Sequence, residues 1–303
     1  MSRLVLIYNP NSTNFSRVKK DILDIKEKIF KEYKLAEYTI KKIGFENNVK
    51  NLKEIVKDGD LLLAAGGDAT SAITANAILE SKKDATLAVL PYGNFNDLAR
   101  TLGTMKLKDI GLTSKPTNLY PLEIHVDGKF WRYATCYVTI GMTAEAVELF
   151  DEPKFRKYMQ KGHKSSWRSY LELAKWYFKN RKKKNFLPEF TINSQPTKKG
   201  VSDYAALSGK SMCRVMKGRY DFKDPKIFRS KALKTVSFPH LFILMAKSIL
   251  YRTPGNETKR DVLEFKNPAT VELQAEGEYQ IFKDIKKIEI KKGDRCLKVI
   301  TKN

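Results

Sequence analysis

Three clusters of polar and turn-forming residues in the first hundred positions have the composition of a phosphate-binding site. They are residues 9–12 (Asn-Pro-Asn-Ser), 66–70 (Gly-Gly-Asp-Ala-Thr) and 91–97 (Pro-Tyr-Gly-Asn-Phe-Asn-Asp). Glycine lets backbone N–H groups approach a phosphate closely, and a helix that follows adds partial positive charge at the same point. Each cluster alone also fits an ordinary turn or a helix cap. Together, in this order, they predict a phosphate or nucleotide site.

The residues between these clusters predict the sheet that must position them. Short, mostly apolar runs at residues 3–8, 60–65 and 87–90 are typical of buried strands, and residues 38–43 are also strand-like. Between these segments, apolar residues recur at helical spacing. They predict a helix that Ser16 can cap and two more at 49–56 and 70–79. This alternation predicts a parallel sheet with helices on its faces. Because ligands bind outside the carboxyl ends of such strands, we expect the three clusters to converge on one crevice.

The pattern changes after Pro121, where strands follow one another with few helices between them. A long helix is expected near residues 165–180 and a second helical stretch at 238–251. The strand-like segments are 122–126, 131–140, 190–192, 203–207, 271–274 and 285–290. We therefore predict an α/β domain at residues 1–120 and an antiparallel β-sandwich at 121–295.

Composition narrows the classes of protein. The net charge of +23 suits nucleic acid, an anionic membrane surface or a uniform lysine enrichment, and the lysines are spread along the chain. Three scattered cysteines and three histidines argue for a reducing compartment and against a zinc site. The apolar start and the apolar stretch at 240–251 are too short for a signal peptide or a membrane span, so we expect a soluble, cytoplasmic protein.

With these motifs in place, the chain resembles the diacylglycerol kinase catalytic-domain family, which includes bacterial lipid kinases and sphingosine kinases. Residues 9–12 correspond to the family's Asn-Pro-x-Ser turn, and residues 66–70 to its Gly-Gly-Asp-Gly-Thr loop. Residues 91–100 match its Pro-x-Gly-Thr-x-Asn-Asp segment, and 141–147 its Gly-x-Asp-Ala-x-Val stretch. Late in the chain, residues 274–278 resemble its Asp-Gly-Glu motif.

The resemblance implies a fold and a reaction. The fold would be a parallel sheet like that of NAD kinases and diacylglycerol kinases, followed by an antiparallel β-sandwich, with ATP in the cleft between them. The last strand, near residues 296–303, would return to the first domain. The reaction would move the γ-phosphoryl group of ATP, with Mg²⁺, to a lipid hydroxyl such as that of diacylglycerol.

The resemblance also implies roles for single residues. Glu278 would be the general base, Asp68 a second catalytic residue and Asp97 a candidate Mg²⁺ ligand. Arg17, Lys19 and Arg100 lie near the loops and are candidates to neutralise phosphate. The residues around the nucleotide would be Asn9, Ser12, Gly66, Gly67, Asp68, Thr70, Gly93, Asn94, Asn96 and Asp97. Such carboxylates, backbone donors and cations are what phosphoryl transfer requires.

Three positions depart from the family's pattern. Ala69 stands where a glycine is usual, and would cost about 1 kcal/mol if that position needs a positive φ. Asn94 replaces a threonine, and Glu276 replaces the aspartate of Asp-Gly-Glu. These departures leave open a catalytically impaired pseudokinase at the membrane surface. NAD kinase is a second alternative, disfavoured because residues 93–97 lack its Asn-x-Gly-x-x-Gly element.

One segment suits contact with an anionic membrane. Aromatic and apolar residues crowd positions 167–178, and a basic run follows at 180–184. Aromatic bulk beside basic residues is typical of interfacial binding to anionic lipid. The same residues also fit a helix whose aromatic face packs into the core. No nucleic-acid motif accompanies them, so we expect a lipid rather than a nucleic-acid partner.

Overall fold

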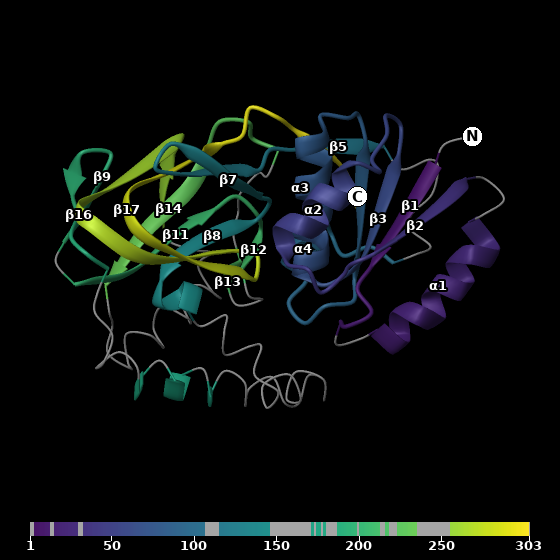
Figure 1. Ribbon diagram of the computed structural model, residues 1–303, viewed down its shortest axis with the longest axis horizontal. Coiled ribbons are helices and arrows are strands. Elements are labelled where there is room, and N and C mark those ends of the chain that lie inside the picture. The colour runs from purple at the N-terminus through teal and green to yellow at the C-terminus, as the bar shows by residue number, and fades with distance from the viewer. Residues whose placement is uncertain are drawn as a thin grey trace.

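The computed structural model describes residues 3–12, 15–29, 33–106, 115–145, 171–172, 174–176, 178–179, 187–198, 200–212, 216–217, 223–234 and 255–302. The strands fall into two large sheets and one two-stranded ribbon. In Figure 1 the two sheets lie side by side, and the C-terminus ends among the elements of the N-terminal part.

The first sheet is mainly parallel and has the strand order β2-β1-β3-β4-β18-β5. Every neighbouring pair in it is parallel except β18 with β5. Its strands are β1 (Arg3–Tyr8), β2 (Lys34–Thr39), β3 (Leu61–Gly66), β4 (Thr86–Pro91), β5 (Pro116–Leu119) and β18 (Leu297–Ile300). The last strand thus lies beside β4, some two hundred residues away in the sequence.

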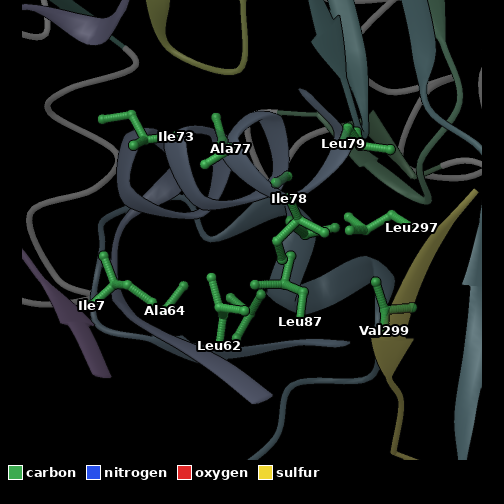
Figure 2. Packing of buried hydrophobic residues seen from close by; sticks show 14 of the residues in the cluster. Ile7, Leu62, Ala64, Ile73, Ala77, Ile78, Leu79, Leu87, Leu297 and Val299 are labelled. Atoms are coloured by element: carbon green, nitrogen blue, oxygen red, sulfur yellow. The ribbon is translucent and has the colours of Figure 1, made fainter. Parts of the chain in front are cut away.

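Helices cover both faces of this sheet. The helices are α1 (Phe15–Ile29), α2 (Phe45–Lys53), α3 (Asp68–Ser81) and α4 (Asp97–Thr101). Leu4 and Leu6 of β1 pack with Val18 of α1, whereas the alternate residues Val5 and Ile7 pack with α2 and α3. This alternation is what a strand buried on both faces requires. Figure 2 shows Ile73, Ala77 and Ile78 of α3 above Ile7, Leu62 and Leu87 of the sheet.

The second sheet is antiparallel and follows the order β15-β14-β11-β8-β16-β17-β6-β7, with β9 and β10 attached to β16. Its strands are β6 (Leu122–Val126), β7 (Lys129–Ala134), β8 (Tyr137–Gly141), β9 (Phe190–Ile192), β10 (Gln195–Pro196), β11 (Val201–Leu207), β14 (Phe228–Lys234), β15 (Asn256–Thr258), β16 (Arg260–Ala275) and β17 (Glu278–Lys292). The ribbon pairs β12 (Ser211–Met212) with β13 (Met216–Lys217).

The long strands β16 and β17 lie between the two halves of this sheet, which are β15-β14-β11-β8 on one side and β6-β7 on the other. β16 pairs with β9 through Leu263–Phe265 and with β8 through Leu273–Ala275, and its register against β17 shifts between these stretches. Buried residues from β6 and β7 join those from β8, β11 and β14 in one hydrophobic cluster. The two halves therefore share a core, as in a sandwich. The predicted fold class, a parallel α/β sheet followed by an antiparallel one, is confirmed.

Several element boundaries differ from those expected. β2 and α2 begin four residues earlier than predicted, and α1 begins at Phe15, so Ser16 lies inside the helix rather than capping it. Residues 131–140 form two strands, not one, because the backbone bends at Thr135 and Cys136. The helical stretch expected at 238–251 lies outside the described residues. Of the segment at 165–184, only seven residues between 171 and 179 are described, and they are helical.

Candidate active site at the glycine-rich loops

The ends of β1, β3 and β4 bring the three polar clusters to one edge of the first sheet. Tyr8 is the register partner of Ala65, and Gly66 is the partner of Pro91. Each cluster starts within one residue of these positions, so strand pairing alone gathers residues 9–12, 66–70 and 91–97. The expected convergence of the clusters follows directly from this register.

Two of the clusters touch backbone to backbone. A Cβ atom added to Gly93 would lie 2.3 Å from the Cα atom of Gly67, and one added to Gly67 would lie 3.1 Å from Cα of Gly93. The N–H group of Tyr92 donates to the carbonyl of Gly66 over 3.0 Å. Glycine is therefore required at 93 because a side chain has no room, rather than because of a positive φ.

Asp68 organises the neighbouring loop. Its carboxylate accepts hydrogen bonds from the backbone N–H groups of Asn96 (2.9 Å) and Asp97 (2.6 Å), at the start of α4. Asn96 has a φ of 56°, and its own side chain bonds both the N–H and the carbonyl of Gly93 over 2.7 Å. Asp68 thus supplies the cap of α4 from another loop, and Asn96 fixes the turn before it.

The carboxylates of Asp68 and Asp97 lie close enough to affect each other. Asp97 is buried. Although Asp68 keeps part of its surface exposed, its burial raises its pKa to about 7, and the charge of Asp97 acts in the same direction. The two N–H donors oppose this rise. Two neighbouring carboxylates of this kind are typical of a place where a cation or proton binds.

The first cluster forms a compact turn. The Asn9 side chain accepts a hydrogen bond from the N–H of Asn11 over 2.9 Å, and its carbonyl accepts one from Ser12 over 3.0 Å. The hydroxyl oxygen of Ser12 is buried and, among the residues that the structure describes, has no hydrogen-bond partner. A buried hydroxyl without a partner is costly, so Ser12 has an unused donor and acceptor at the sheet edge where the clusters meet.

A hairpin from the second sheet brings two further acids to this region. Ala275 pairs with Glu278, and the turn between them consists of Glu276 (φ 54°) and Gly277 (φ 91°). Positive φ at both residues is typical of a two-residue hairpin turn. Glu278, the expected base, is therefore the first residue of β17 and partly exposed.

Glu276 is buried at the same turn. Its carboxylate accepts hydrogen bonds from the Thr135 hydroxyl (2.5 Å) and from the backbone N–H of Cys136. Burial raises the pKa of Glu276 to about 7, and the charge of Asp68 contributes. The Cys136 thiol lies 3.5 Å from the Thr101 hydroxyl of α4. The hairpin turn is therefore connected to the helix that Asp68 caps.

A second connection between the sheets passes through α3. The side chain of Asn76, which is buried, accepts from the N–H of Tyr133 (2.9 Å) and donates to the Tyr133 carbonyl (3.0 Å). This pair of bonds joins α3, which begins at Asp68, to β7 of the second sheet. Asn76 was not anticipated from the sequence, where it lies in an ordinary helical run of small residues.

The candidate phosphate-binding cations differ in their surroundings. The Arg100 Nε atom donates to the carbonyl of Phe95 over 2.8 Å, which ties Arg100 to the third cluster. Arg17 lies over the ring of Tyr92 at 5.8 Å, and the Tyr92 hydroxyl donates to Asp21 over 2.6 Å. Lys19 is exposed on α1. A role for any of these three in phosphate binding stays a prediction.

Two of the expected nucleotide residues have surroundings that the motif did not suggest. The Thr70 side chain is buried beneath Gly66, where an added Cβ would lie 2.3 Å from the Thr70 hydroxyl oxygen. Asn94 is partly exposed, as expected of a residue that contacts ligand. Ala69 is the second residue of α3 and has no positive φ, so the strain considered for it does not arise.

Comparison with known proteins agrees with the resemblance in the motifs. The family "Diacylglycerol kinase catalytic domain" matches residues 3–117. A diacylglycerol kinase of Staphylococcus epidermidis is 37% identical over 102 residues, which cover 33% of this chain and 31% of that protein. One from Staphylococcus aureus is 34% identical over 101 residues, with the same coverage. The match thus spans about a third of the length of these relatives.

Solved structures are similar over nearly the whole chain. The crystal structure of a diacylglycerol kinase from Bacillus anthracis covers 99% of this chain and 97% of its own, with a TM-score of 0.63 and 14% identity. Two further structures from the same organism reach TM-scores of 0.68 and 0.69 at 16% and 17% identity. At this identity the likeness concerns the fold of both sheets.

Proposed function

From the match of residues 3–117 to the diacylglycerol kinase catalytic-domain family, we propose that the protein is an ATP-dependent lipid kinase. It would transfer the γ-phosphoryl group of ATP to the hydroxyl of diacylglycerol or a related lipid. The observation that carries the proposal is the meeting of the two glycine loops, with Asp68 and Asp97 beside them and with Glu276 of the hairpin close enough for the charge of Asp68 to affect it.

The donors around the loops suit a nucleotide. The unpartnered hydroxyl of Ser12 and the close backbone approach at Gly67 and Gly93 support phosphate binding at this edge of the sheet. Asn9 and Asn94 would add contacts from the first and third clusters. Exposed Lys19 and Arg17, from α1, would neutralise phosphate charge, whereas Arg100 would hold the third cluster in place.

The carboxylates suit Mg²⁺ bound together with phosphate. Among the described residues, no group of three or more His, Cys, Asp and Glu side chains lies together as a protein-only metal site. Mg²⁺ in kinases is usually held by one or two carboxylates plus the phosphates of the nucleotide, which fits Asp97 with Asp68 beside it. When bound there, Mg²⁺ would neutralise charge on the transferring group.

Glu278 would be the general base. In the proposed step, the oxygen of the lipid hydroxyl forms a bond to the γ-phosphorus while the bond from that phosphorus to the bridging oxygen of ADP breaks. The hydroxyl proton passes to the Glu278 carboxylate. Its place at the start of β17, next to a turn connected to α4, supports this role.

The lipid must be reached from the bilayer surface. No helix among the described residues is long and apolar enough to cross a membrane. We propose peripheral contact with an anionic membrane, supported by the net charge of +23 and the aromatic and basic residues at 167–184.

The test is a phosphorylation assay with purified protein, labelled ATP, Mg²⁺ and fractionated lipid extract, with dioleoylglycerol micelles and NAD as separate acceptors. Label is expected in a diacylglycerol or related lipid fraction and not in NAD. Glu278→Gln should lower lipid phosphorylation by about 100-fold or more, as expected on loss of a general base. Glu289→Gln, farther along β17 and paired with Arg260, is the matched control. Labelled NAD without labelled lipid would disprove the proposal.

A further inference from the structure

Arg132 of β7 is a buried arginine at the boundary between the two sheets. Its guanidinium lies 4.1 Å from the ring centroid of Phe45, on α2, and 4.1 Å from that of its neighbour Trp131. Only 5% of its side chain is exposed. Contact with two aromatic rings restrains the guanidinium and removes it from water.

The hydrogen bonding of Arg132 is incomplete. Its Nη2 atom donates to Glu46 of α2 over 2.8 Å, while Nε and Nη1 are buried and have no hydrogen-bond partner within the described part of the chain. An unpaired buried donor on a charged group is costly and requires an explanation. Nε and Nη1 are therefore available to an acceptor that comes within reach of Arg132.

The charges that face Arg132 are the acids of α2 and of the hairpin. Burial lowers the pKa of Arg132, whereas Glu46, then Glu278 and Glu276, raise it. Trp131 reaches the same hairpin, since its Nε1 atom donates to Gln280 over 2.8 Å. The ring of Trp131 also meets Phe282 edge-on at 5.3 Å. The side chains of β7 are therefore packed against the first residues of β17, where Glu278 lies.

We propose that Arg132 is a positioning residue for Glu278, holding its carboxylate ionised and directed toward the glycine loops through the donors Nε and Nη1. A general base must be unprotonated to accept a proton, and an adjacent guanidinium favours that form. Glu46 anchors Arg132 to α2, so the base is positioned relative to the domain that carries the loops. This inference rests on the proposed function of Glu278.

Two variants of Arg132 separate charge from packing. Arg132→Gln removes the charge and Arg132→Lys keeps it, and kcat/KM is measured from pH 5 to 9 with dioctanoylglycerol in mixed micelles. In Arg132→Gln, kcat should fall about 10- to 100-fold. The acid limb of the pH profile of kcat/KM should move up by about one pH unit. Arg132→Lys should keep the acid limb in place. Arg295→Gln is the control, because Arg295 also joins the two parts of the chain, through the Leu79 carbonyl at 3.0 Å.

A second measurement does not need activity. In protein labelled with ¹³C in the glutamate carboxyl groups, the Glu278 signal is the one that Glu278→Gln removes. Its titration midpoint should rise by about one unit in Arg132→Gln. It should fall by a few tenths of a unit in Glu46→Gln, which leaves Arg132 without its competing acid. The Glu46 side chain is 58% exposed, so this variant tests the idea even if Arg132→Gln does not fold.

The outcomes separate this inference from the proposed function. If the wild type phosphorylates lipid but neither the acid limb nor the Glu278 midpoint moves in these variants, Arg132 has only a packing role. If the wild type phosphorylates no lipid, the proposed function fails, and the Glu278 midpoint alone decides whether Arg132 controls this carboxylate.

Discussion

The candidate site is built from two regions that reach it in different ways. At the edge of the first sheet, residues adjacent in sequence to three parallel strands are brought together by strand register and by backbone contact at Gly67 and Gly93. The hairpin of β16 and β17 comes from the second sheet and is connected by buried side chains. Glu276 bonds to Thr135 and Cys136, more than 130 residues away in the sequence.

The difference concerns what each region can tolerate. Backbone contact depends on the absence of side-chain atoms, so its weak points are glycines, and damage to it is steric. The hairpin depends on carboxylates that are not fully hydrated. Its sensitive positions are therefore charged residues, and the effect of changing them on stability and activity depends on pH. The following variants test whether the two regions are separable in this way.

The largest effect is expected from Gly93→Ala. Its Cβ would lie 2.3 Å from Cα of Gly67, so the two loops must separate. Overpacking of this kind costs about 1–3 kcal/mol, and a displacement of about 1 Å at a catalytic loop costs roughly 100-fold in rate. Chemical denaturation and a lipid kinase assay measure the two losses.

A graded series checks the cause of that loss. Gly67→Ala, with its contact at 3.1 Å, should lose less than Gly93→Ala, and Gly293→Ala, with contacts of 3.5 Å or more, should lose little. Equal losses in Gly67→Ala and Gly293→Ala would contradict the steric account of the loop contact.

Asn76→Ala should cost about 2–3 kcal/mol of stability. The substitution leaves both the N–H and the carbonyl of Tyr133 without the Asn76 side chain that now pairs with them. Asn47→Ala is the matched control, since Asn47 is exposed on α2 and its side chain donates to the Ile43 carbonyl over 2.8 Å. Urea denaturation of the two variants compares them, and an equal loss in both would mean that the α3–β7 connection contributes little.

The hairpin should make stability depend on pH through Glu276. Its pKa is about 7 in the folded protein and about 4.3 in an unfolded chain, so between these values the folded state holds a proton that the unfolded chain has lost. Stability therefore falls as the pH rises through this window, by up to about 4 kcal/mol.

Glu276→Gln should remove much of that fall and should be more stable than the wild type at pH 8. Asp68, whose pKa is also raised to about 7, should leave a remaining slope of the same sign. Guanidinium denaturation at pH 5 and pH 8 measures the difference. If the free energy of unfolding of Glu276→Gln depended on pH as steeply as that of the wild type, the Glu276 carboxylate would not be the source of this dependence.

The division between the sheet edge and the hairpin also separates the features that could be predicted from the sequence from those that could not. The parallel strands and the loops after them were predictable, because buried strands are continuous apolar runs and close backbone contact demands glycine. β14 and β15 were not predicted, since their residues are partly polar and exposed. The bend at Thr135 that splits β7 from β8 was also missed. It coincides with hydrogen bonds to Glu276, and no local pattern encodes a partner so distant in the chain.

Arg132 and Asn76 escaped notice for the same reason. An arginine between aromatic residues of a strand, or an asparagine in a helix of small residues, looks like a solvent-facing position until the other sheet is packed against it. Asp68, by contrast, was singled out by its motif, but its two hydrogen bonds to the start of α4 follow only from the position of the third cluster.

The smallest effect is expected from Ala69→Gly, which restores the glycine usual in the family. The motif alone suggests that alanine strains this loop and impairs activity, so that glycine would raise both the stability and the activity. The structure predicts the opposite, because Ala69 is helical within the first turn of α3. Glycine in a helix costs up to about 1 kcal/mol relative to alanine, so the variant should be less stable by roughly 0.5–1 kcal/mol with lipid kinase activity within about twofold. A several-fold gain in activity would show that position 69 adopts another conformation when substrate is bound.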